Sequence, residues 1–79
     1  MLVELTTYET IWVNGPRVDG NNIQVVIINS NLIESMYKTI IVGGKVGFFI
    51  HLNKPVAIDY TNNKVDWLIA PHWPEGLLK

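Results

Sequence analysis

The stretch KVGFFIHLNKPVAIDYTNNKVDWLI, residues 45–69, decides the fold, because apolar and polar side chains alternate through most of its length. Alternation with a period of two is typical of a strand that buries one face. The pattern is interrupted at 53–55, which contains a proline, and at the asparagine pair 62–63, which suits a tight hairpin turn. The stretch therefore predicts three strands, at 45–52, 56–61 and 65–69.

The register of these strands follows from counting residues across each turn. A two-residue loop at 62–63 pairs Ile58 with Trp67, and a three-residue loop at 53–55 pairs Ile50 with Ile58. Both hairpins then place their apolar side chains on the same face, as a consistent register requires. We therefore predict an antiparallel meander with Trp67 in its core.

The N-terminal third predicts two further strands joined by a loop. Residues 2–13 are rich in β-branched and aromatic side chains, and a break in their alternation indicates a bulge or bend near Thr6-Thr7. Two clusters of turn-forming residues make 14–22 an expected loop. The nearly uninterrupted apolar run at 23–28 indicates a strand that is covered on both faces, or on one face by a partner.

Residues 31–41 are predicted to form the single helix. Asn31 and Glu34 have the spacing of a capping box, and apolar residues follow at helical intervals. The expected fold class is α+β: an antiparallel sheet of about five strands, in the order β-β-α-β-β-β, with one helix packed on it. The β-branched residues of 39–42 favour strand instead, and the alternative fold is then a small all-β barrel.

Length and composition predict one small soluble domain, residues 1–79, with a proline-rich C-terminal tail at 71–79. The chain is 48% hydrophobic and 16% charged and contains no cysteine, so disulfides cannot support its small core. Surplus apolar surface on a small domain usually lies in an interface. We therefore expect a homo-oligomer, a dimer or larger, that associates through the apolar strand and the second face of the meander.

The charge balance bears on the class of partner. The net charge is −1, and the six basic residues are well spread, which makes nucleic acid an unlikely partner. Neither a signal peptide nor an apolar run of membrane-spanning length is recognisable, so the expected location is cytoplasmic, in the host cytoplasm if the chain is viral. No cofactor and no metal site is expected, since only two histidines offer good zinc ligands.

A weak acidic cluster follows from the expected register. Asp59 falls opposite Asp66 on the second face of the meander, with His51 diagonally near. Two facing carboxylates repel each other unless they hold a cation or a proton, so a weak metal site or an acid–base pair is one interpretation. Solvated surface carboxylates are far commoner than sites, and this interpretation is favoured.

Two further groups of side chains are candidates for binding. Large apolar side chains and a tail histidine are candidates for contact with a protein partner or a second copy: Trp73, His72, Trp12, Phe49 and Leu68. Trp73 has a second interpretation, in which it fastens the tail onto the domain. Polar and aromatic side chains in or near the expected loops are candidates for a ligand: Arg17, Asp19, Lys45 and Tyr8.

These observations favour binding over catalysis, and no residue is assigned a catalytic role. The first hypothesis is a small protein-binding or regulatory module that acts by surface complementarity, of the size of a phage-type inhibitor of a host protein. The alternative is a nucleotide or small-ligand binding protein that stacks aromatic side chains on a ring. A second alternative is a small enzyme that uses the face with Asp59, Asp66 and His51.

Overall fold

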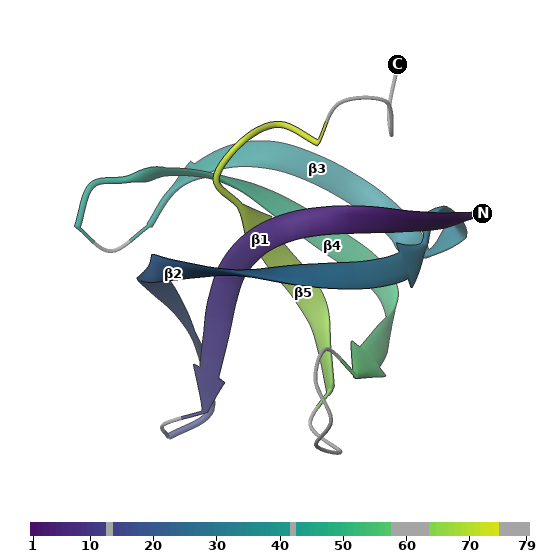
Figure 1. The fold of residues 1–79 in the computed structure, drawn as a ribbon, viewed down its shortest axis with the longest axis horizontal. Coiled ribbons are helices and arrows are strands. Elements are labelled where there is room, and N and C mark those ends of the chain that lie inside the picture. Colours follow the sequence, from purple (N-terminus) through teal and green to yellow (C-terminus); the bar gives the residue numbers. More distant parts are fainter. Residues whose placement is uncertain (13, 42, 58–63, 75–79) are drawn as a thin grey trace.

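The computed structural model describes residues 1–12, 14–41, 43–57 and 64–74, and these form an all-β fold (Figure 1). Five strands and one short 3-10 turn follow each other along the chain: β1 (Leu2–Trp12), β2 (Pro16–Asn29), η1 (Ser30–Leu32), β3 (Ile33–Ile40), β4 (Val46–Ala57) and β5 (Lys64–Ala70). The strands form two antiparallel sheets, β1-β2 and β3-β4-β5. The α+β prediction is therefore wrong, and the alternative small all-β fold fits.

The predicted helix at 31–41 is replaced by η1 and β3. β3 pairs with β4 from Ile33↔Leu52 to Ile40↔Val46, with a register shift between Ile33 and Ser35. The partly buried residues of β3, Ile33, Met36 and Thr39, are three positions apart. A three-residue interval resembles a helical pattern, whereas the β-branched residues that follow favour a strand.

The predicted three-stranded meander also has the wrong strands. β4 runs through Asn53-Lys54-Pro55 without a turn, and β3 supplies the third strand of the sheet. Val65 pairs with Val56, and Trp67 pairs with His51. The predicted pairs Ile58–Trp67 and Ile50–Ile58 are therefore wrong: Trp67 has another partner, and Ile50 pairs with Leu68. The predicted turn at 62–63 lies outside the described residues.

β1 and β2 form one long hairpin that bends near its middle (Figure 1). The register shifts between Tyr8 and Glu9, where β2 carries the extra residues 20–22, close to the predicted bend. The expected loop at 14–22 is instead a tight turn followed by a paired strand. Asn14 and Gly15 have φ values of 54° and 98°, the left-handed region that tight hairpin turns require.

The core lies between the two sheets. It consists of aliphatic side chains from four strands, with two threonines of β1 buried beside them: Leu5, Val26, Ile28, Ile50, Leu52, Val65, Leu68, Ala70, Thr7 and Thr10. β1 also contacts β5, which brings the two sheets together along one side. No helical segment in the described part of the chain has the length and apolar character to span a membrane.

Candidate binding groove

A groove with a volume of about 740 Å³ lies between the β1–β2 hairpin and the β3-β4-β5 sheet. Its hairpin wall is the outer half of the hairpin, which is the half next to the turn. The hairpin supplies one wall: Ile11, Pro16, Arg17, Val18 and Gly20. The sheet and Ile41, which directly follows β3, supply the remainder; the lining residues in the sheet are Thr39, Ile40, Phe49, Trp67 and Ile69. The lining is mostly apolar, and its volume is within the range of ligand sites in proteins. We call this feature the groove.

The groove is lined by the face of the sheet that points away from the core. Phe49 pairs with Ile69, and these side chains line the groove, whereas Ile50 and Leu68 form the next pair and are buried in the core. Adjacent residues of a strand point to opposite faces, which explains this division. The register shift between His51 and Val56 places Val65 and Leu68 both in the core although they differ by an odd number of positions.

Aromatic rings stack across all three strands of this sheet. The ring centroids of Tyr37 and Phe49 are 5.1 Å apart with an interplanar angle of 19°. The ring centroids of Phe49 and Trp67 are 6.3 Å apart with an angle of 18°. Neighbouring strands are about 4.8 Å apart, so near-parallel rings on paired strands overlap with an offset. Two of these rings, Phe49 and Trp67, line the groove.

Arg17 is the cationic side chain of the groove lining, and it is exposed. It pairs with Ile11 in the hairpin, directly after the tight turn. The lining also includes the Thr39 hydroxyl and the indole of Trp67. A guanidinium beside apolar and aromatic walls suits an occupant that combines an apolar or planar part with an acidic group.

Polar contacts connect the hairpin to the start of β4 and stabilise the bulge of β2. The Lys45 ammonium donates to the Gly20 carbonyl oxygen at 2.7 Å, and the Tyr8 hydroxyl donates to the Val46 carbonyl oxygen at 3.4 Å. Asp19 accepts from the Asn21 backbone N–H at 2.9 Å and from the Asn22 amide at 2.8 Å. Those two hydrogen bonds, with the nearby Lys45 charge, lower the pKa of Asp19 below its usual 3.8.

The predicted ligand residues therefore have different positions. Arg17 lines the groove. Lys45 and Tyr8 donate to the carbonyl oxygens of Gly20 and Val46, and Asp19 accepts hydrogen bonds within the bulge. The structure thus brings the four into one region, and only Arg17 is part of the groove surface. Sequence reasoning did not identify the aliphatic lining, because Ile11, Val18 and Ile69 have the pattern of ordinary strand residues. The wall forms only because the hairpin bends.

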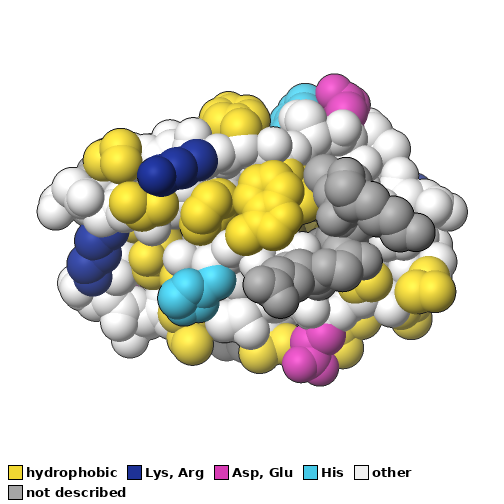
Figure 2. Space-filling view, turned by 90° about the horizontal axis from the view of Figure 1, so that it is seen from above, with side chains coloured by type: hydrophobic (Ala, Val, Ile, Leu, Met, Phe, Trp, Pro, Cys, Tyr) yellow, Lys and Arg dark blue, Asp and Glu magenta, His cyan; other side chains and the backbone are white. Residues whose placement is uncertain are grey.

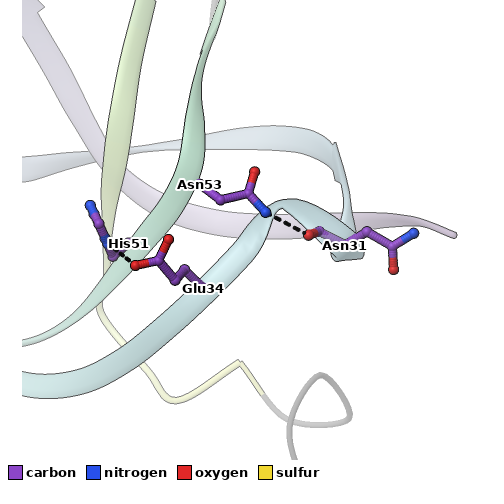
Figure 3. Close-up of polar contacts among 4 residues, drawn as sticks. All are labelled: Asn31, Glu34, His51 and Asn53. Atoms are coloured by element: carbon purple, nitrogen blue, oxygen red, sulfur yellow. Dashed lines mark hydrogen bonds and ion pairs between the residues drawn. The ribbon is translucent and has the colours of Figure 1, made fainter.

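The structure describes two of the three members of the predicted acidic cluster. Asp59 lies outside the described residues, and Asp66 is exposed on β5. His51 instead lies beside Glu34 of β3, with 3.3 Å between Nδ1 and Oε1 (Figure 3). Nearby, the Asn53 amide donates to the Asn31 carbonyl oxygen at 3.0 Å (Figure 3). These contacts connect β4 to η1 and β3.

The predicted interface residues have different surroundings. Trp73 packs edge-on against Phe48, with 5.6 Å between ring centroids, and is 39% exposed. Hydrophobic side chains gather at the centre of the face that lies over β3 and residues 71–74 (Figure 2). His72 is exposed, Trp12 packs against the core, and Leu68 is buried in it. Phe49 and Leu68 lie on opposite faces of the sheet, because Phe49 lines the groove and Leu68 is in the core.

A comparison of this chain with protein-family models, curated proteins and solved structures finds no match.

Proposed function

We propose that this chain is a small non-enzymatic protein-binding module, with the groove as its recognition surface. The observation that supports this most is the lining of the groove, in which apolar and aromatic side chains surround one guanidinium. Burying an apolar side chain of a partner there gains about 1.5–3 kcal/mol of transfer free energy. A carboxylate of the partner can accept from Arg17. The occupant is therefore a protein segment with a large apolar side chain next to an acidic one.

Charge reversal at Arg17 tests this proposal. Arg17→Glu removes the attraction for an acidic segment, and its side chain is exposed, so the fold tolerates the change. Lys54→Glu is the matched control, because it makes the same change in net charge at an exposed position on β4 that is not part of the lining. Affinity capture from an extract of the source cells is expected to recover a partner with the wild type and with Lys54→Glu. Equal recovery with Arg17→Glu would contradict the proposal.

A small planar ligand is the second candidate, and the stacking of Phe49 with Trp67 is what favours it. A ring of the ligand extends such a stack, and Arg17 binds its acidic group, as in an acidic nucleotide. The double variant Trp12→Phe/Trp73→Phe leaves Trp67 as the only tryptophan. Quenching of its fluorescence by members of a nucleotide panel would support this candidate. An unchanged emission across the panel would leave the protein segment as the occupant.

We also propose that the protein forms a homo-oligomer and acts in the cytoplasm. Self-association is supported by aliphatic side chains exposed on β2, namely Ile23, Val25 and Ile27. The cytoplasmic location agrees with a composition that lacks cysteine. An action as a phage-type inhibitor would follow if the captured partner is a host protein. Native mass spectrometry of the purified chain measures the oligomeric state.

A further inference from the structure

The inner half of β2, which lies beyond the bulge and away from the hairpin turn, carries an exposed aliphatic stripe. Ile23, Val25 and Ile27 alternate along the strand and are 61%, 57% and 63% exposed. Their neighbours across the hairpin are Tyr8, Thr6 and Glu4 of β1. Monomers seldom expose three adjacent large aliphatic side chains on one strand. We call Ile23, Val25 and Ile27 the β2 stripe.

β2 is also an edge strand in the described part of the chain, where β1 is the strand that pairs with it. An edge strand presents a row of unpaired backbone donors and acceptors, so natural proteins usually protect it with lysine, proline or a bulge. From Gly20 to Ile33 the chain has no charged residue and no proline. From Ile23 to Asn29 the register with β1 has no shift. The strand therefore lacks the usual protection.

The sequence of the β2 stripe is self-complementary. In an antiparallel pair centred on Val25, Val25 faces the same residue of the second copy, and Ile23 faces the second copy's Ile27. The uncharged ends match as well, since Asn21 faces Asn29. A two-fold axis requires a surface patch that fits a second copy of itself, and this arrangement of residues meets that requirement. Cross-strand aliphatic pairs of this kind stabilise a sheet.

We propose that two copies of this chain form a dimer by antiparallel pairing of β2 with β2, centred on Val25. The two hairpins then join into one continuous sheet, in the strand order β1-β2-β2-β1. This inference specifies the self-association proposed above and is independent of the groove, which lies on the outer half of the hairpin and on the other sheet.

A lysine at the centre of the pair tests the proposed axis. Val25→Lys places two like charges directly opposite each other, so the dimer is lost. Thr6→Lys is the matched control, because Thr6 pairs with Val25, is exposed on the same face and belongs to β1. Light scattering after size exclusion is expected to give about twice the chain mass of 9.0 kDa for the wild type and for Thr6→Lys. Val25→Lys is expected to give the monomer mass.

A charge-swapped mixture shows whether Val25→Lys acts through the interface or through the fold. Val25→Lys and Val25→Glu are each expected to be monomeric, and their mixture is expected to restore the dimer mass, because opposite charges then meet at the axis. The chain has no cysteine, so Val25→Cys supplies a single thiol. Facing residues of an antiparallel pair have Cα atoms about 4.5–5.5 Å apart, within the range of a disulfide. Mild oxidation is therefore expected to join the two copies.

The outcomes distinguish the proposed pairing of β2 with β2 from self-association through another surface. A wild type that stays monomeric at every concentration would overturn both. A dimer that survives Val25→Lys, or that is lost equally with Thr6→Lys, would overturn the β2 pairing and leave self-association through another surface. A dimer whose Val25→Cys variant does not form the disulfide would also overturn the register.

Discussion

The Lys45 ammonium donates a hydrogen bond of 2.7 Å to the Gly20 carbonyl oxygen, and it lies 3.5 Å from the Asn21 side-chain oxygen. The two residues are 25 positions apart in the sequence. Lys45 directly precedes β4, and Gly20 lies in the bulge of β2, so this contact connects the hairpin to the sheet beside the groove. The wall formed by the hairpin is therefore held against the sheet by a contact that a single substitution removes.

We predict that Lys45→Met lowers the free energy of unfolding by about 0.5–1.5 kcal/mol, the usual net contribution of one hydrogen bond. The methionine keeps the apolar part of the side chain, so the change isolates the ammonium. Lys54→Met is the control, because Lys54 is exposed on β4, and it should change stability by less than about 0.5 kcal/mol. Urea denaturation followed by tryptophan fluorescence measures both. Equal effects of the two variants would contradict a role for the Lys45 contact.

The lowered pKa of Asp19 predicts how its contribution to stability depends on pH. A folded-state pKa below the unfolded value means that the ionised group stabilises the fold above the unfolded value, near 3.8. The contribution is lost as the pH falls through the folded pKa, because protonation removes the charge that Asn21, Asn22 and Lys45 stabilise. The difference in unfolding free energy between the wild type and Asp19→Asn is therefore expected to be constant near neutral pH and to shrink below about pH 3.8. A difference that grows on acidification would contradict this assignment.

Gly47 allows Ile69 to pack closely against β4. A Cβ atom at Gly47 would lie 2.6 Å from the Ile69 Cγ2 atom and 3.3 Å from the Ile41 Cγ2 atom. Gly47→Ala is therefore expected to lower stability by about 1–3 kcal/mol, as overpacking does. Removing the Cγ2 atom in Gly47→Ala/Ile69→Ala should relieve part of that cost, which a double-mutant cycle measures.

Gly20→Ala is the matched control for this experiment. A Cβ atom at Gly20 would lie 3.4 Å from the Ile41 Cδ1 atom, which is the end of a flexible side chain. We expect Gly20→Ala to cost less than Gly47→Ala in the same denaturation assay. The reverse order would show that the strands can move apart at Gly47 without cost.

The His51–Glu34 pair is predicted to contribute little. The two side chains are 39% and 55% exposed, so water screens the attraction between them. A double-mutant cycle with Glu34→Gln and His51→Ala should give a coupling of less than about 1 kcal/mol at neutral pH. A coupling well above that value would contradict the screening of this pair by water.

Local sequence patterns predicted strands better than they predicted strand partners. The alternation at 45–52 and 65–69 identified parts of β4 and β5, and residues 2–13 and 23–28 identified β1 and the inner part of β2. The partners depended on where the chain turns, and Pro55 suggested a turn that β4 does not make. Proline at an irregular position of a strand is tolerated, because the register shift between His51 and Val56 removes the need for a regular donor there.

The groove could be predicted only in part. By side-chain type, Phe49 was a candidate for contact with a partner and Arg17 a candidate for contact with a ligand, and both line the groove. Trp67 was expected in the core, because the assumed register gave it the wrong face. The aliphatic wall depends on the bend at Tyr8/Glu9, which brings the outer half of the hairpin next to the sheet. Contacts between segments so distant in the sequence leave no local pattern.

A photo-crosslinking amino acid placed in the groove tests the proposed function most directly. Ile40 is the position for the probe, because it lines the groove and is 62% exposed; Lys54 is the exposed control position on β4. In an extract of the source cells, the probe at 40 is expected to crosslink one protein that the probe at 54 does not. Adding Arg17→Glu to the chain with the probe at 40 is expected to abolish that crosslink. Identical products from the two positions, or a crosslink that persists with Arg17→Glu, would contradict the groove as the recognition surface.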